Sequence, residues 1–108
     1  MPAKSKIKGS NFERRVVNIA KKRGIEAKRA YASNGKSFGL SETIDVLIGK
    51  FRGQCKIRKN IASWLKPDKD CDVQIVKENR GDIYVIIKYE KFLRLIKKEL
   101  STDELASR

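Results

Sequence analysis

The sequence predicts an α/β domain in which helices flank a mixed β-sheet. Residues 10–23 and 89–100 carry apolar side chains at the spacing of an amphipathic helix. Between these segments lie short runs rich in β-branched residues, separated by glycine-containing turns. A chain of 108 residues with 40% hydrophobic content suits one domain with a single core. We therefore expect one folded domain over residues 9–100.

The ends of this domain are marked by cap and charge patterns. Residues 1–8 contain three lysines and are expected to form a flexible basic arm. Ser10 and Glu13 match the S-x-x-E capping box, so the first helix should begin at Ser10. Gly24 stands where a left-handed C-terminal cap is expected. The polar residues 101–108 should fray.

The middle of the chain reads as strands joined by turns. The expected strands are residues 26–32, 43–48, 52–57, 73–77 and 83–88. A short helix capped by Asn60 should end before Pro67, and residues 78–82 form a hairpin turn signal. The resulting order is one helix, three strands, a short helix, two strands and a final helix.

The charge composition predicts a polyanionic partner and excludes several kinds of catalysis. The chain has 26 Lys and Arg against 13 Asp and Glu, a net charge of +13. Nucleic acid would relieve this self-repulsion, with an anionic membrane surface as the second choice. The absence of histidine excludes Ser-His-Asp and Cys-His nucleophiles and His-ligated zinc. Hydrolysis would have to use carboxylates, amides, lysine, hydroxyls or thiols.

The remaining composition points to the cytoplasm. The longest apolar run, residues 83–87, is far below the roughly 20 residues of a membrane helix. No apolar segment follows the basic N-terminus, so no secretory signal is expected. Two cysteines in a domain of this size are expected to be reduced thiols. We expect a cytoplasmic protein, or one of the host-cell cytoplasm if it is viral.

The hairpin around Gly49 gathers the chemically useful side chains. If Gly49-Lys50 is a two-residue turn, Asp45 lies opposite Gln54; a four-residue loop places it opposite Lys56. Both loops give the same two faces. The apolar face comprises Ile44, Val46, Ile48, Phe51, Gly53, Cys55 and Ile57. The polar face comprises Thr43, Asp45, Leu47, Arg52, Gln54 and Lys56.

The polar face predicts a divalent metal site. Opposed side chains begin with Cβ atoms about 4.5–5.5 Å apart, so oxygens of Asp45 and Gln54 can share one cation. Mg²⁺ prefers carboxylate oxygens with water and substrate phosphate, and Mn²⁺ can substitute for it. Lys56 can orient or help to deprotonate a water that attacks a phosphodiester. Glu13 is the candidate for a further carboxylate.

Plainer interpretations compete with this one. Aspartate is depleted in strands, yet Asp45 could simply form a cross-strand salt bridge with Lys56. Glu13 could serve only as the capping-box residue. Cys55 points to the core by alternation and should be inert.

These residues, taken in order, resemble those of the archaeal and phage-type Holliday junction resolvases of the PD-(D/E)xK nuclease superfamily. The matching segments are GSNFERR at 9–15, AKRA at 27–30, SNG at 33–35, IDVLIG at 44–49 and QCK at 54–56. The resemblance implies a restriction-endonuclease-like α-β-β-β-α-β core. It also implies a metal-dependent endonuclease that works as a homodimer and cuts two symmetry-related strands of a four-way DNA junction.

The resemblance also assigns roles by position. It implies acidic metal ligands at Glu13 and Asp45, the motif lysine at Lys56, and a metal-ligating backbone carbonyl at Cys55. Ser33 matches a loop serine near the scissile phosphate, and Arg29 a basic residue just before that loop. The implied catalytic set is therefore Glu13, Ser33, Asp45, Gln54 and Lys56.

Two positions depart from the family pattern. Ile44 replaces a proline and still points to the core. Gln54 replaces an acidic residue; its amide oxygen can bind Mg²⁺, but the site loses one negative charge and should bind metal more weakly. Either Glu13 compensates, which the retained Lys56 favours, or Glu42 moves in, or DNA binding is kept and cleavage lost.

Basic residues around this site are expected to contact DNA phosphates. They are Arg14, Arg15, Arg29, Lys36, Arg52, Arg58 and Lys59. Few aromatics are free to stack on bases, so recognition of branched DNA shape is expected. Because paired cuts need two sites, a two-fold homodimer is also expected. Two alternatives stay open: a related nuclease acting on flaps, nicks or ends, and a non-catalytic nucleic-acid-binding protein.

Overall fold

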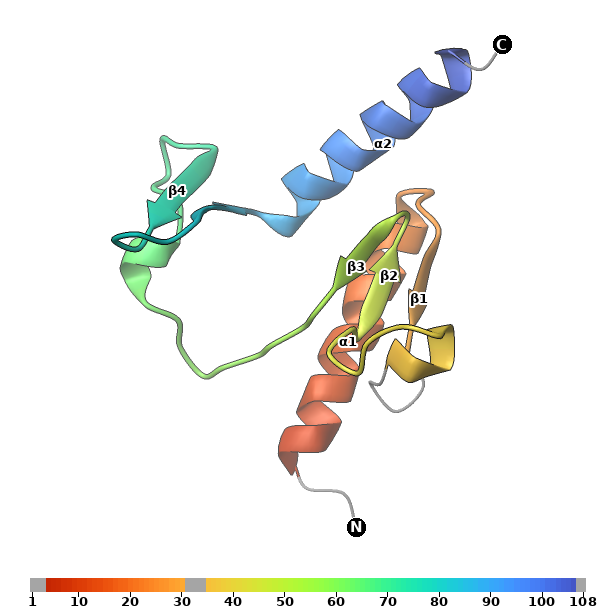
Figure 1. The fold of residues 1–108 in the computed structure, drawn as a ribbon, viewed down its shortest axis with the longest axis horizontal. Helices are drawn as coiled ribbons and strands as arrows, with labels where there is room; N and C mark the ends of the chain where they lie inside the picture. The colour runs from red at the N-terminus through yellow and green to blue at the C-terminus, as the bar shows by residue number, and fades with distance from the viewer. Residues whose placement is uncertain (1–3, 31–34, 107–108) are drawn as a thin grey trace. The chain divides into compact units, whose positions relative to one another are not determined.

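The computed structural model describes residues 4–30 and 35–106 and confirms the α/β class (Figure 1). The chain divides into two compact units, Met1–Ile57 and Arg58–Arg108. The strand pairings within the described ranges are all antiparallel. They form a three-stranded sheet in the order β1-β2-β3 and a two-stranded sheet of β4 and β5, rather than one mixed sheet. The short connections after β2 and β4 permit only antiparallel pairing.

The first unit is a helix packed on the three-stranded sheet (Figure 1). Its elements are α1 (Lys4–Lys22), β1 (Ala27–Arg29), the 3₁₀ helix η2 (Gly35–Phe38), β2 (Val46–Ile48) and β3 (Phe51–Gly53). The buried apolar side chains of this unit are Val16, Val17, Ala20, Ile25, Ala27, Ala30, Ile44, Val46 and Ile48. The core therefore lies between α1 and the faces of β1 and β2.

The predicted C-terminal end of α1 is confirmed, but its predicted start is not. The cap at Gly24 is confirmed: its N–H donates to the Lys21 carbonyl at 2.9 Å, and the Ile25 N–H donates to the Ala20 carbonyl at 3.0 Å. The helix begins at Lys4, however, and not at Ser10. Between Lys4 and Ser10 the only poor helix former is Gly9, and a glycine in a helix interior costs only about 1 kcal/mol. Residues 4–8, expected as a flexible arm, are therefore helical.

The second unit contains a hairpin and the C-terminal helix. Its elements are the 3₁₀ helix η3 (Ser63–Leu65), β4 (Val73–Lys77), β5 (Ile83–Ile87) and α2 (Tyr89–Ala106). The predicted bounds of β4 are confirmed, whereas α2 runs six residues past its predicted end at residue 100.

Side-chain contacts tie the elements of this unit together. The Gln74 amide donates to the Trp64 carbonyl at 2.7 Å and joins β4 to η3. The Lys91 amine donates to Asp72 Oδ1 at 2.5 Å and joins α2 to the start of β4. This hydrogen bond and the Lys91 charge lower the pKa of Asp72 below its ordinary value.

None of the helices within residues 4–30 and 35–106 combines the length and the apolar character needed to cross a membrane.

Candidate active site

The β2–β3 hairpin has the predicted two-residue turn. Leu47 pairs with Arg52 and Ile48 with Phe51, which leaves Gly49 and Lys50 as the turn residues. Gly49 has a φ of 55°, the left-handed value that a type II′ turn requires at its first position. The last pair of the ladder is Val46 with Gly53. Asp45 and Gln54 therefore lie just beyond the regular pairing, where strict alternation of side chains is no longer enforced.

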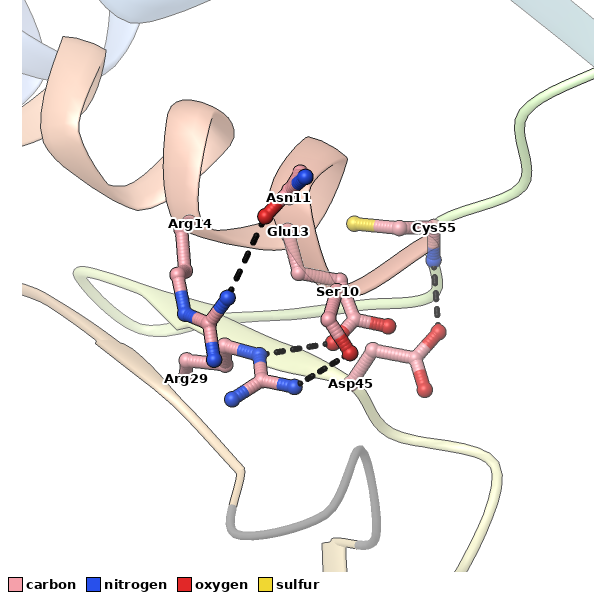
Figure 2. Close-up of polar contacts among 7 residues, drawn as sticks. All are labelled: Ser10, Asn11, Glu13, Arg14, Arg29, Asp45 and Cys55. Carbon is pink, nitrogen blue, oxygen red and sulfur yellow. Dashed lines mark hydrogen bonds and ion pairs between the residues drawn. The ribbon is translucent and has the colours of Figure 1, made fainter. Parts of the chain in front are cut away.

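Asp45 is held at this position by three hydrogen bonds. Its N–H donates to the Gly53 carbonyl at 2.9 Å, and its own carbonyl accepts from the Ala30 N–H at 2.8 Å. Its Oδ2 accepts the Cys55 N–H at 2.8 Å, as Figure 2 shows. The carboxylate thus spans the open ends of β2 and β3. The pairing of Val46 with Gly53 needs a glycine at position 53, because a Cβ there would lie 2.8 Å from Val46 Cγ2.

Asp45 does not pair with Lys56. Among the residues described by the structure, no salt bridge or side-chain hydrogen bond joins the two, and Lys56 is exposed. Within the described ranges, the cross-strand salt bridge that would have made Asp45 purely structural is therefore absent. Lys56 is therefore accessible to solvent.

Glu13 is a buried carboxylate paired with arginine. It is 5% exposed, and its Oε1 accepts from Arg29 Nε at 2.9 Å. Arg29 Nη2 also donates to Ser10 Oγ at 3.0 Å (Figure 2). The capping-box interpretation was wrong, because Ser10 and Glu13 lie inside α1 and not at its start. Residues three apart share one helix face, so both reach the same arginine.

Cys55 lies beside the two carboxylates. Its side chain is partly buried, and this burial, followed by the charges of Asp45 and then Glu13, raises the pKa of the thiol to about 11. Figure 2 places Glu13, Asp45 and Cys55 in one cluster with Ser10 and Arg29. Burial and these two charges therefore favour the protonated thiol.

We expect Asp45→Asn to speed alkylation of Cys55 at pH 8. Burial raises the thiol pKa most, and the Asp45 charge raises it further, so removing that charge lowers the pKa and increases the thiolate fraction. The rate of iodoacetamide labelling, followed by mass spectrometry in a Cys71→Ser background, measures this effect because Cys71 is exposed. Asp70→Asn is the matched control and should leave the rate unchanged. An unchanged rate in Asp45→Asn would show that the thiol does not face this carboxylate.

The candidate ligands at the Asp45 end of the hairpin are oxygen atoms, which a hard cation prefers, but together they carry little negative charge. The candidate oxygen donors are the Asp45 carboxylate, the amide of Gln54, which follows the last ladder residue Gly53, and the carbonyl of Cys55, whose N–H donates to Asp45. Gln54 is exposed, and Glu42 forms a salt bridge with Lys36 at 2.5 Å instead of joining the site. Within residues 4–30 and 35–106, no three His, Cys, Asp or Glu side chains are grouped as metal ligands. A metal site here would therefore need other oxygens in addition to the Asp45 carboxylate.

The predicted DNA-binding residues are mostly exposed cations. In the first unit these are Arg14, Arg15, Lys36 and Arg52; in the second they are Arg58 and Lys59. Arg14 Nη1 donates to Asn11 Oδ1 at 3.2 Å. Arg29 differs because its side chain is only 21% exposed. Ser33 lies outside the residues that the structure describes.

Sequence reasoning missed the part that Ser10 plays and the groove along α1. A groove of about 420 Å³ is lined by Lys4, Ile7, Lys8, Asn11, Phe12, Arg15 and Ile57. The signal for Ser10 is its i, i+3 spacing to Glu13, which also matches a capping box. The signal for the groove is the positive charge of residues 4–8, which also suits a flexible arm.

Comparison with known proteins identifies one family. A family model described as archaeal Holliday junction resolvase (hjc) matches residues 4–107, nearly the whole chain. No curated protein and no solved structure shows a significant match.

Proposed function

Because the chain belongs to the archaeal Holliday junction resolvase family, we propose that it is a metal-dependent endonuclease that resolves four-way DNA junctions by paired phosphodiester hydrolysis. The observation that carries the proposal is the position of Asp45 at the open end of the β2–β3 ladder, with Glu13 beside it and an exposed Lys56 that, among the described residues, forms no salt bridge. A carboxylate that is oriented by backbone and not neutralised by its neighbouring lysine is suited to a catalytic task.

The residues of the site divide the chemistry among them. Asp45, the Gln54 amide oxygen and the Cys55 carbonyl would hold Mg²⁺ or Mn²⁺, which supplies neutralisation of phosphate charge and activation of water. Lys56 orients the attacking water and takes part in moving its proton. Arg29, already oriented by Glu13 and Ser10, and the exposed Arg52 hold the phosphate in line.

The α1 groove extends the DNA-binding surface beyond this site. Lys4, Lys8 and Arg15 surround an apolar floor formed by Phe12 and Ile57. Cations spaced along one helix suit successive phosphates of a DNA arm, which they contact without reading bases. This surface supports recognition of DNA backbone geometry inside the cell, where junctions form.

Cleavage of defined DNA substrates tests the function. We expect Mg²⁺-dependent nicking of a four-way junction at a rate at least about tenfold above that of a flap or a linear duplex of the same sequence. Equal cleavage of flaps would favour the related-nuclease alternative. Binding without cleavage of any substrate in Mg²⁺ or Mn²⁺ would favour the non-catalytic alternative and contradict the proposal.

We further propose that the active form is a homodimer. Each chain supplies one candidate site, and paired cuts require two sites related by two-fold symmetry. One face of the β4–β5 hairpin offers an interface: Ile75 is 63% exposed, Val85 57% and Ile83 66%. Ile75 and Val85 are cross-strand partners, and Ile83 lies on the same face. An isolated hairpin with such an apolar face is marginal in water, and a second copy would cover it.

The substitution Val85→Glu is expected to dissociate the dimer. A charge on the apolar face cannot be buried without a partner, so the mass from analytical ultracentrifugation should fall from twice 12.4 kDa to 12.4 kDa. Tyr84→Glu places the same charge on the opposite face of the hairpin and should leave the dimer intact. A monomeric parent protein, or a Val85→Glu variant that stays dimeric, would contradict this interface.

A further inference from the structure

The candidate site has little net negative charge. Glu13 contributes one negative charge, but Arg29 lies 2.9 Å from its Oε1 and contributes one positive charge. Gln54, the neighbour of Asp45 across the end of the ladder, is neutral. Among the residues that the structure describes, Asp45 is in no salt bridge, so it is the carboxylate left to attract a cation.

Binding to such a site alone gives a divalent cation little favourable free energy. Mg²⁺ gives up its hydration water reluctantly, and proteins bind it through carboxylates together with substrate phosphates. With Asp45 as the one carboxylate of the site outside any salt bridge in the described part of the chain, most of the favourable charge must come from elsewhere. A DNA phosphate placed beside Asp45 brings both a negative charge and oxygen donors.

We propose that Gln54 makes metal binding at this site depend on DNA, so that the divalent cation and the junction bind cooperatively and the free protein holds the metal only weakly. This inference rests on the proposed function, since it requires a metal at Asp45. The Gln54 amide then has a regulatory consequence, because the site binds the metal that hydrolysis needs only when the DNA substrate is bound.

Thermodynamic linkage gives the proposal a second, independent readout. If DNA strengthens metal binding, the metal must strengthen DNA binding by the same factor. Elsewhere on a surface of this charge, Mg²⁺ competes with Lys and Arg for phosphates and weakens binding. The two effects have opposite signs, so the response of junction affinity to Mg²⁺ separates a coupled site from a merely basic surface.

The direct test measures bound Mn²⁺ by electron paramagnetic resonance, first with the protein alone and then with the protein and a four-way junction. A gel run on the same samples checks that the junction stays uncut during the measurement. We expect the parent protein alone to leave Mn²⁺ free, and its complex with the junction to bind at least about tenfold tighter. Complexes with Asp45→Asn measure the Mn²⁺ held by DNA itself. Gln54→Glu should bind Mn²⁺ at least about tenfold tighter than the parent protein without DNA, whereas Asn18→Asp, which adds the same charge to an exposed position of α1, should not.

The failures of the two proposals are distinguishable. If the parent protein binds Mn²⁺ without DNA as tightly as Gln54→Glu does, the inference is overturned while the metal-dependent function stands. If neither protein binds Mn²⁺ above the Asp45→Asn background, with or without the junction, the metal site itself is absent and both fail. At constant ionic strength, Mg²⁺ should raise the junction affinity of the parent protein and lower that of Asp45→Asn; a decrease in both would also overturn the inference.

Discussion

Asp45→Asn should slow cleavage of a four-way junction at least about 10³-fold, which corresponds to about 4 kcal/mol of transition-state stabilisation. The amide keeps the shape of the side chain and removes the one carboxylate of the site that no arginine or lysine neutralises among the described residues. Single-turnover rates on a labelled junction in Mg²⁺ measure the loss. Junction affinity without divalent metal should stay within about threefold, or increase, because a negative charge near phosphate is gone.

The control and the contradicting result are both clear for this variant. Asp70→Asn removes the same charge from an exposed position of the second unit and should leave the cleavage rate unchanged. Retention of cleavage in Asp45→Asn would exclude Asp45 from the chemistry. A joint loss of fold, binding and cleavage would instead assign Asp45 a structural role through its bond to the Cys55 N–H.

Arg29→Met is expected to lower the free energy of unfolding by about 3 kcal/mol. It removes the cationic partner of Glu13, whose side chain is only 7% exposed, and breaking one side of a buried ion pair costs about 3–5 kcal/mol. Methionine keeps the length and apolar bulk of the arginine stem. Equilibrium unfolding in urea, followed by circular dichroism, measures the change.

A double substitution separates a lost charge partner from lost packing. Glu13→Gln in the Arg29→Met background removes the uncompensated charge and should restore most of the stability. Arg29→Lys keeps a positive charge but loses the simultaneous contact with Ser10 and should be intermediate. A loss below about 1 kcal/mol in Arg29→Met, or a double variant no better than the single one, would contradict the buried-pair account.

Local signals in the sequence were sufficient for much of the fold. Gly24 marked the end of α1, and Gly49-Lys50 predicted the register of β2 and β3, because positive φ and loop length are set by a few neighbouring residues. The bounds of β4 followed in the same way from its β-branched run. The start of α1 was not predicted, because the S-x-x-E pattern at Ser10 and Glu13 lies inside the helix and does not cap it.

The site was predictable in composition but not in contacts. Asp45, Glu13 and Lys56 were all identified as candidates, yet the partner of Glu13 is Arg29, 16 residues away on β1. No local pattern reports a tertiary ion pair. The surroundings of Asp45 were also missed, because alternation of side chains holds only as far as the last ladder pair, Val46 with Gly53.

Mapping the cuts on a four-way junction tests the central claim most directly. The junction is labelled in turn on each of its four strands and incubated with the protein in Mg²⁺, and the products are sized at nucleotide resolution. The account predicts two cuts at symmetry-related positions on opposing strands, both absent in Asp45→Asn. Cuts on a single strand, cuts unrelated by two-fold symmetry, or an uncut junction would contradict it.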